Sequence, residues 1–489
     1  MADGEWGGVQ FRVASASKVP GQPVDTQLTF SYGGWQQARG AELSHTDGTH
    51  GNRFYVEGNI EFLDTAGEWH LDQQTRVLSL IPPDGLITIA GGVESLELDL
   101  VVTQADSLFH FLGSSSTSDS DRVKNIVVAN MTLAHTSAQF FLPHEETSGG
   151  DYAVHRGGAI FAENATMLKI VGNKIEHIGG NGVFLSNSVR NVSVRENTFS
   201  FLGTSGVSLV GRTGGAMMDA RDGEAMVAAA AASASTSNNG TAGSATSPSV
   251  DNLVRFPKDN LVEHNIFHDY GIWDKQSAAF HKALAPGNRF SNNVCFNSSR
   301  HGVNFQDSMG GAGVVSGNVF FNLNRETSDT SALNSWGRRN YIISDSEETP
   351  AKPRLMPAQA NSWRGNLILN RNYYGVRDGN GNALRCDDGA SWYNMSGNVM
   401  YNAGMEFNGG TQVFSHGNLF VHGGWTVCAA PPDYGGGSND IFVDNQFMWT
   451  SICGMDKCLA FYKVKRYPIG LFFGVKSRIV VPVDVRGPI

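Results

Sequence analysis

The sequence predicts an all-β protein, a right-handed, single-stranded parallel β-helix in which each coil stacks on the next. Two observations carry this prediction: an asparagine motif recurs nine times, and a second strand pattern recurs between its copies. The composition of the 489 residues agrees, with 58 glycines for tight turns and 40 % apolar residues for a packed interior. Self-similarity at short intervals is typical of solenoid proteins.

Each asparagine motif has an asparagine followed two residues later by an apolar side chain. The positions are Asn173, Asn197, Asn265, Asn293, Asn318, Asn366, Asn398, Asn418 and Asn445. The shorter spacings, 20 to 28 residues, fit one coil. We interpret the 48-residue gap after Asn318 as two coils and the 68-residue gap after Asn197 as a long insertion. Stacked asparagines are expected to hydrogen-bond in a column at about 4.8 Å spacing. A turn-surface role is the alternative.

The second recurring strand runs from Gly158-Ala-Ile-Phe to Ala383-Leu-Arg-Cys. Because side chains alternate faces along a strand, one face should fill the core. The predicted core face comprises Ala159, Val183, Val207, Ala279, Val303 and Leu333, then Phe161, Leu185, Leu209, His281, Phe305 and Ser335. The predicted outward face turns from apolar to polar in the order Ile160, Phe184, Ser208, Phe280, Asn304, Asn334 and Arg385. Strands joined by so few residues leave no room for crossover helices, which favours a solenoid.

Three regions are expected along the chain. Residues 1–100 form a strand-rich N-terminal region, which we expect to be truncated. Residues 101–452 form the β-helix, interrupted at 211–250 by an Ala/Ser/Gly/Thr tract that cannot bury enough apolar surface to fold. Residues 453–489 lack the motif and are expected to form a C-terminal cap or an irregular tail.

Charge and hydropathy exclude several classes of partner. Lys plus Arg number 36 and Asp plus Glu 46, a net charge of −10 that argues against nucleic acid. No apolar run is long enough for a membrane span. Five scattered cysteines predict no disulfide framework, and six Asn-x-Ser/Thr sequons favour the secretory route. We therefore expect a monomeric, extracellular or cell-surface glycoprotein, although the first residues show no signal-peptide pattern.

Several polar blocks resemble a known superfamily. They are Val154-His-Arg-Gly-Gly, Lys275-Gln-Ser-Ala-Ala-Phe, Arg300-His-Gly-Val-Asn-Phe-Gln-Asp, Asn324-Arg-Glu-Thr-Ser-Asp, Asn334-Ser-Trp and Asp387-Asp-Gly. With residues 61–72 and 80–85, they resemble right-handed β-helix proteins of the pectate-lyase-like superfamily and are similar to β-helix glycoside hydrolases of the fucosidase/xylanase kind. The resemblance covers roughly residues 50–450 and implies a polysaccharide or oligosaccharide as partner. Hydrolases, lyases and epimerases share this fold, so it does not select a reaction.

The candidate catalytic residues are carboxylates of the later coils. They are Asp307, Glu326, Asp387 and Asp388. Cleavage of a glycosidic bond needs one protonated carboxyl group and one carboxylate, and clustered carboxyl groups supply that difference. Asp307 and Asp387 sit at nearly the same strand offset two coils apart, about 10 Å, which loosely fits the spacing of inverting enzymes. A turn is the structural alternative for Asp307 and for Asp387-Asp-Gly, and a salt bridge with Arg325 or Arg338 is the alternative for Glu326 and Asp329.

Ten further residues are candidates for substrate binding. They are His155, Arg156, Lys275, Gln276, Arg300, His301, Asn304, Asp329, Asn334 and Trp336. Trp336 is expected to be an exposed platform for a sugar ring. The basic residues keep open a polysaccharide lyase or epimerase acting on a uronic-acid polymer, and a non-catalytic glycan-binding protein is the third hypothesis. No metal site or cofactor is predicted, with Ca²⁺ on paired aspartates as the one alternative.

Overall fold

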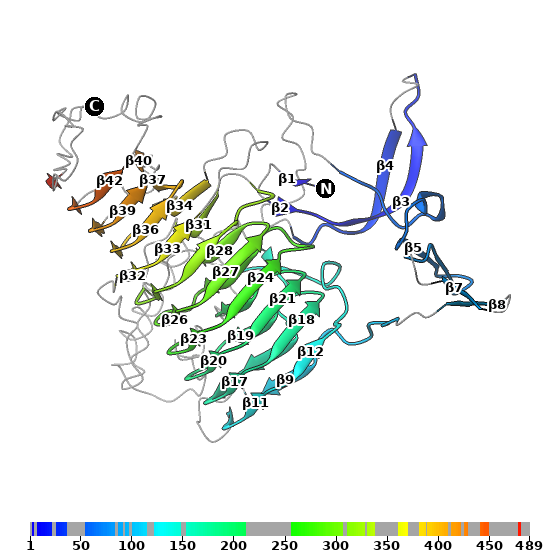
Figure 1. Ribbon diagram of the computed structural model, residues 1–489, viewed down its shortest axis with the longest axis horizontal. Coiled ribbons are helices and arrows are strands. Elements are labelled where there is room, and N and C mark those ends of the chain that lie inside the picture. The colour runs from blue at the N-terminus through cyan, green and yellow to red at the C-terminus, as the bar shows by residue number, and fades with distance from the viewer. Residues whose placement is uncertain are drawn as a thin grey trace, which may run out of the picture.

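The computed structural model describes residues 2–3, 7–21, 26–36, 54–83, 87–90, 93–96, 100–114, 122–147, 153–211, 256–306, 311–327, 330–337, 360–369, 381–387, 389–408, 412–421, 425–428, 441–448 and 478–480. Within them the chain winds into coils of three short strands, and equivalent strands of successive coils pair into three long sheets (Figure 1). All coil-to-coil pairing is parallel, and an antiparallel strand, β43 (Arg478–Val480), joins one edge. The fold is the parallel β-helix that the sequence predicts.

The first sheet contains β11 (Val127–Ala129), β17 (Lys169–Val171), β20 (Ser193–Arg195), β23 (Leu261–Glu263), β26 (Arg289–Ser291), β29 (Val314–Ser316), β32 (Asn361–Arg364), β35 (Tyr393–Ser396), β38 (Val413–His416), β41 (Ile441–Val443) and β43. The second sheet contains β12 (Thr132–Ala134), β18 (Lys174–Ile178), β21 (Thr198–Leu202), β24 (Ile266–Tyr270), β27 (Val294–Ser298), β30 (Val319–Phe321), β33 (Leu367–Leu369), β36 (Val399–Tyr401), β39 (Leu419–Val421) and β42 (Gln446–Met448). The third sheet contains β9 (Phe109–Leu112), β15 (Ile160–Glu163), β19 (Val183–Ser186), β22 (Val207–Val210), β25 (Ala278–Ala283), β28 (His301–Gln306), β31 (Thr330–Trp336), β34 (Gly381–Asp387), β37 (Gly404–Asn408) and β40 (Trp425–Cys428).

The asparagine column is confirmed at the corner between the first and second sheets. Every amide from Asn173 to Asn418 donates from Nδ2 to Oδ1 of the asparagine one coil on, over 2.9–3.1 Å. The same oxygens accept the preceding rung's backbone N–H, as from Asn293 to Asn318. The residue before each rung has a positive φ, and glycine occupies that place in several coils, such as Gly317 and Gly397. The corner is therefore a turn whose polar groups satisfy one another.

The interpretation of the 48-residue gap as two coils is wrong. Asn318 donates directly to Asn366, and Val319 pairs with Leu367, so the gap is one coil with an insertion. Asn197 likewise donates directly to Asn265. The tract at 211–250 lies outside the described residues apart from Gly211. Of the tail at 453–489, the structure describes only β43.

The predicted faces of the third sheet need a shift of one residue in two strands. Val207 pairs with Phe280 and Ser208 with His281, so Phe280 lies in the core and His281 points outward. Ile160 pairs with Val183, so Ile160 is in the core. A slip of one residue exchanges the two faces of a strand. The small residues Ala159, Ala278 and Ala279 do not indicate from the sequence which face of their strands is buried.

The interior between the three sheets is filled by stacked apolar side chains. Phe199, Phe267, Phe290 and Phe320 follow one another along the axis, with ring centroids 4.6, 5.8 and 6.4 Å apart. All four are fully buried. Because each coil adds one ring to the stack, the coils bury apolar surface only in each other's presence.

The N-terminal part of the chain consists of hairpins beside the helix (Figure 1). They are β1 (Ala2–Asp3) with β2 (Gly7–Gly8), β3 (Phe11–Lys18) with β4 (Thr26–Gly33), β5 (Trp69–Asp72) with β6 (Val77–Leu80), and β7 (Ile87–Ala90) with β8 (Val93–Leu96). A 3-10 turn, η1 (Ile60–Phe62), precedes β5. Two short pairs flank the first coils: β13 (Glu145–Glu146) with β14 (Ala153–Val154), and β10 (Val123–Lys124) with β16 (Ala165–Thr166). Among the described residues, no helix is long and apolar enough to cross a membrane.

Candidate functional site

The outward side of the third sheet changes character along the axis, as the sequence predicts. One outward column reads Phe161, Phe184, Ser208, His281, Asn304, Asn334, Arg385 and Glu406. The next reads Glu163, Ser186, Val210, Ala283, Gln306, Trp336, Asp387 and Asn408. In the early coils Val154 packs with Phe161, Phe184, Val210 and Ala283. We call the outward side of β25, β28, β31, β34 and β37 the polar face.

Two carboxylates share one guanidinium at the far end of the polar face. Arg385 Nη2 lies 2.9 Å from Asp387 Oδ2, and Arg385 Nε lies 3.4 Å from Glu406 Oε2. Asn408 Nδ2 also donates to Asp387 Oδ1 over 2.7 Å. Arg385 and Glu406 are paired across neighbouring strands, so Asp387 and Glu406 are diagonal neighbours with Cα atoms about 8 Å apart. The cation favours the ionised form of both carboxyl groups.

This end of the polar face is also where solvent reaches it. The Asp387 and Glu406 side chains are 17 % and 14 % exposed, whereas His281 and Asn304 are fully buried. Asn304 joins its neighbours on both sides, because its amide contacts His281 Nδ1 at 3.2 Å and it accepts from Asn334 Nδ2 at 3.1 Å. Burial lowers the pKa of His281 to about 3, so the ring is neutral. The buried end therefore carries no charge, and the open end carries the charges.

Trp336 lies on the outward side, in register between Gln306 and Asp387. It is only 4 % exposed, so the expectation of an exposed aromatic platform is wrong. The ring is packed between the side chains of neighbouring coils rather than displayed to solvent. Its position next to Asp387 nevertheless places it at the open end of the polar face.

Arg300 and His301 form a closed pair where β28 begins. Arg300 Nε donates to His301 Nε2 over 2.9 Å, and His301 Nδ1 lies 2.8 Å from the Ser331 carbonyl oxygen. The carbonyl can only accept, so Nδ1 carries the proton. Burial and the positive charge of Arg300 hold the pKa of His301 well below its usual range. Both ring nitrogens are occupied, which leaves no lone pair to remove a proton from a substrate.

Lys275 and Glu326 form an ion pair at the edge of the same sheet, with Nζ 2.7 Å from Oε2. Lys275 also donates to the carbonyl oxygens of Gly271 and Ile272. The sequence alternative placed Glu326 in a salt bridge with an arginine, and the observed partner is Lys275 instead. Half of the Glu326 side chain is exposed.

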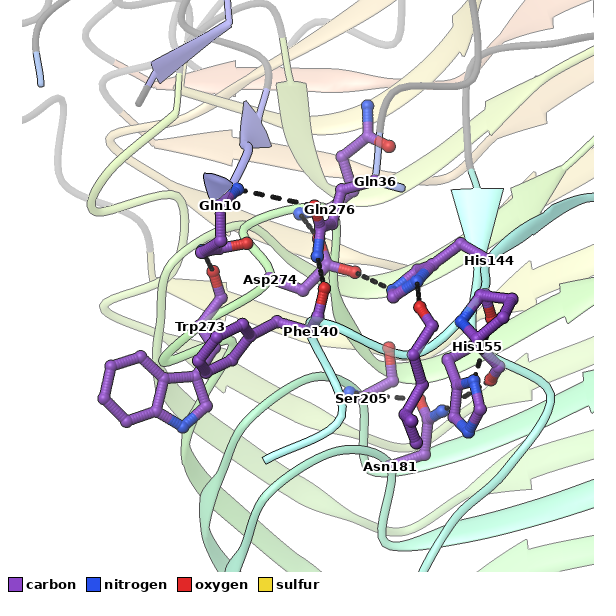
Figure 2. A network of polar contacts seen from close by, with 12 residues as sticks. Gln10, Gln36, Phe140, His144, His155, Asn181, Ser205, Trp273, Asp274 and Gln276 are labelled. Carbon is purple, nitrogen blue, oxygen red and sulfur yellow. Dashed lines mark hydrogen bonds and ion pairs between the residues drawn. The ribbon is translucent and has the colours of Figure 1, made fainter. Parts of the chain in front are cut away.

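The neighbouring Asp274 is a buried carboxyl group that is not among the candidates from the sequence (Figure 2). Its Oδ1 accepts from the Gln276 backbone N–H over 3.0 Å, and its Oδ2 lies 3.8 Å from His144 Nε2. Desolvation raises the pKa of Asp274 to about 7 and lowers the pKa of His144 to about 4. The His144 Nδ1 atom faces the Leu142 carbonyl oxygen at 2.8 Å, so its Nε2 lone pair is turned toward Asp274. At 3.8 Å the two atoms are too far apart for a hydrogen bond, and Asp274 Oδ2 is buried without a hydrogen-bond partner.

The N-terminal segment packs over this corner (Figure 2). Gln10 Nε2 donates to the Trp273 carbonyl oxygen over 2.6 Å, and Gly7 lies against the Gln276 side chain. A Cβ atom on Gly7 would lie 3.1 Å from Gln276 Cγ. Gln276, a predicted substrate-binding residue, is thus covered by the chain's own β2.

His155 and Arg156 lie several coils upstream of the carboxylates. Arg156 pairs with Glu145, and it donates to Ser186 Oγ and to the carbonyl oxygens of Val210 and Gly211. His155 Nδ1 lies 2.9 Å from the Pro143 carbonyl oxygen. These contacts hold residues 143–147 and 153–156 against the early coils, and His155 and Arg156 do not join the polar face.

The structure therefore brings together some of the predicted residues and separates others. Asn304, Asn334, Trp336 and Asp387 share the polar face, with Arg300, His301, Lys275 and Glu326 at its edge. Asp307, Asp329 and Asp388 lie outside the described residues. Glu406 was missed, although Gly404-Met-Glu-Phe repeats the strand pattern one coil after Ala383-Leu-Arg-Cys. Within the described residues, no group of three or more His, Cys, Asp or Glu side chains could hold a metal ion.

One comparison with a solved structure supports the fold. No family model and no curated protein matches the chain. A glycoside hydrolase of solved structure is similar over 86 % of this chain, with 15 % identity and a TM-score of 0.57. This chain spans 66 % of that hydrolase, less than two thirds of its length. An alginate lyase from Paenibacillus sp. str. FPU-7 (10 % identity, 67 % of this chain, 87 % of that chain) gives a TM-score of 0.34.

A thermostable α-1,3-glucanase catalytic unit from Streptomyces thermodiastaticus strain HF3-3 gives a TM-score of 0.26, with 14 % identity over 67 % of this chain and 60 % of that chain. Of these structures, the hydrolase with a TM-score of 0.57 shows a shared fold, and its 15 % identity does not define an activity. The class that fold and comparisons define is the parallel β-helix protein. The reaction has to be argued from the residues of the polar face.

Proposed function

We propose that this protein is a carbohydrate-active enzyme, a glycoside hydrolase that cleaves a polysaccharide at the open end of the polar face. The observation that carries the proposal is the pair of carboxylates, Asp387 and Glu406, on neighbouring coils around Arg385. The location expected from the sequence, extracellular or cell surface, fits a polymeric substrate.

The division of roles follows from charge. Asp387 and Glu406 are held ionised by Arg385, so either can act as base or nucleophile, but neither is suited to donate a proton. The acid therefore has to be a different carboxyl group. We assign this role to Asp388 or Asp307, which follow strands β34 and β28 directly in sequence.

Elimination by a lyase is the weaker hypothesis, because it needs a cation to neutralise a uronic carboxylate. Arg385 already serves two carboxylates, and Lys275 serves Glu326 and two carbonyl oxygens. His301, the candidate base, has both ring nitrogens engaged. These contacts favour hydrolysis over elimination or epimerisation.

The test is incubation of the purified protein with a panel of neutral, uronic and sulfated polysaccharides. New reducing ends without an unsaturated uronic product would support hydrolysis. An unsaturated product would instead establish a lyase, and binding without products would establish a glycan-binding protein. Asp387→Asn and Glu406→Gln should each remove the activity, while Glu176→Gln, which breaks a surface ion pair with Lys174, should retain it.

A further inference from the structure

A second polar column lies at the corner before the first sheet, and it contains a gap. Asn260 donates from Nδ2 and from its backbone N–H to Asn288 Oδ1, over 2.9 and 3.0 Å. The strand register places Gly313 and then Asn361 in the next two coils. Gly313 donates its backbone N–H to Asn361 Oδ1 over 3.0 Å, but it has no side-chain amide to give. One rung of this column is therefore missing.

Lys282 of β25 fills the gap from inside the core. Its place in the third sheet is inward, in register between Leu209 and Phe305. Its Nζ lies 3.3 Å from Asn361 Oδ1 and 4.0 Å from the centroid of the Phe305 ring. A Cβ atom on Gly313 would come within 2.8 Å of this Nζ. The amine thus occupies the space in which an asparagine side chain would have stood.

We propose that Lys282 and Asn361 become joined by an intramolecular isopeptide bond. The Lys282 Nζ lone pair attacks Cγ of the Asn361 carboxamide, and an Nζ–Cγ bond forms. The Cγ–Nδ2 bond then breaks, and one proton of the amine leaves with Nδ2 as ammonia. No electrons are exchanged with an oxidant or reductant, and no co-reactant is required.

The surroundings meet the requirements of this reaction. Attack needs an uncharged amine, and desolvation lowers the pKa of Lys282 to about 7. The carboxamide oxygen accepts the Gly313 backbone N–H over 3.0 Å, which polarises the carbonyl carbon, and the 3.3 Å contact of Lys282 Nζ with the same oxygen places the amine beside that carbon. The departing Nδ2 atom is buried without a hydrogen-bond partner, so nothing holds it in place.

Burial and the fixed placement of the two side chains also favour the reaction. Lys282 and Asn361 are 2 % and 1 % exposed, so water cannot compete for the carbonyl carbon. Fixed placement of two reacting groups corresponds to effective molarities of about 10⁵–10⁸ M. The bond would tie β25 in the third sheet to β32 in the first sheet across the interior. It would lie directly beneath the polar face, one residue from His281.

Mass spectrometry of the wild-type protein tests the proposal directly. The intact mass is expected to be lower than the sequence mass by one ammonia molecule. A tryptic digest is expected to contain residues 276–289 linked to residues 355–364, with no cleavage after Lys282. Lys169, an exposed lysine on the first sheet, serves as the control because cleavage should occur there normally. Free 276–282 and 355–364 peptides with an undiminished intact mass would overturn the proposal.

Two variants complete the test. Lys282→Met keeps an unbranched side chain in the core and removes the amine, and Lys282→Arg keeps a cation without a reactive amine. Both variants should show the full sequence mass and an unlinked 355–364 peptide. Persistence of the ammonia loss in either variant would place it at another residue and would reject the assignment. Because the wild-type mass decides the matter, failure of a variant to fold would not leave the question open.

Discussion

The asparagine column and the polar face are both stacks of polar side chains in a parallel β-helix, yet they differ in kind. The column repeats one residue, and each amide between its two ends, from Asn197 to Asn418, both donates to and accepts from its copies. The polar face carries different residues along the axis, from His281 through Asn304 and Asn334 to Arg385 and Glu406. Identical amides can stack without limit, whereas identical charges would repel. Variety within a register therefore marks chemistry, and repetition marks structure.

The first prediction concerns the charges at the open end of the polar face. Asp387→Asn and Glu406→Gln should each lower the rate of polysaccharide cleavage by about 10²–10⁴-fold, because each removes a base or nucleophile. Asn318→Ala in the asparagine column should leave the rate of the folded protein unchanged. Equal losses of activity after substitutions in the polar face and in the asparagine column would contradict a catalytic role specific to the polar face. Initial rates measured on folded fractions provide the comparison.

The second prediction uses pH, since the asparagine column has no titratable group. Asp274 has a pKa of about 7 when folded, against an ordinary aspartate pKa of 3.8, so the folded state keeps a proton that the unfolded state loses. Stability from this group is therefore lost as pH rises from about 4 to about 7. Asp274→Asn should raise the free energy of unfolding at pH 8, by up to about 4 kcal/mol, and not at pH 4.

Urea unfolding of the wild type and of Asp274→Asn at both pH values measures this difference. Asn318→Ala is the matched control, because its cost should be the same at pH 4 and pH 8. A gain from Asp274→Asn that does not depend on pH would show that the carboxyl group is not the titrating group. The difference between variant and wild type is the quantity to compare, since buried His144 titrates in the opposite direction.

The third prediction separates charge from packing within the polar face. Arg385→Met should lower the free energy of unfolding by about 3 kcal/mol, because it leaves two partly buried carboxylates without their cation. Combining it with Asp387→Asn and Glu406→Gln should recover most of that loss while activity stays absent. Recovery of stability without activity would show that the ion-paired group serves function rather than folding. Thermal and urea unfolding of the single and triple variants measure the effect.

The fourth and smallest prediction concerns a single rung of the asparagine column. Asn318→Ala removes the donors to the Phe290 carbonyl oxygen and to Asn366 Oδ1, and it leaves the Asn293 side-chain amide without its acceptor. The expected cost is about 2 kcal/mol, since a buried unsatisfied polar group costs about 1–3 kcal/mol. Asn130→Gly, at an exposed position whose positive φ glycine adopts freely, should cost much less. Equal costs at the two positions would argue against the column as a source of stability.

Much of the fold was predictable because it rests on repetition. The nine asparagines identified the column correctly, because identical amides repeated at short intervals can hydrogen-bond to one another when the coils stack in register. The strand faces were correct wherever a bulky apolar residue anchored the register, as at Val183 and Val303. The predicted buried face was wrong by one residue at Ala159 and Ala279, because small side chains fit either face of the strand.

The candidate site was less predictable, because its contacts cross coils. Asp387 and Asn334 were placed on the correct face by alternation alone. No pattern in the sequence indicates that Arg385 links Asp387 to Glu406, or that Trp336 is covered. Asp274 and His144 are 130 residues apart in the chain, and their side chains come within 3.8 Å of each other only in the folded structure.

The sequence by itself determined that this chain is a parallel β-helix, because hydrogen-bonding side chains repeated once per coil can be satisfied only by stacking. It also determined which flank becomes polar. Only the tertiary structure decided the register at the alanine-rich strands, the sharing of Arg385 between two carboxylates, and the entry of Lys282 into the gap at Gly313. Those outcomes depend on the distances between side chains of different coils, and the sequence repeat carries no information about these distances.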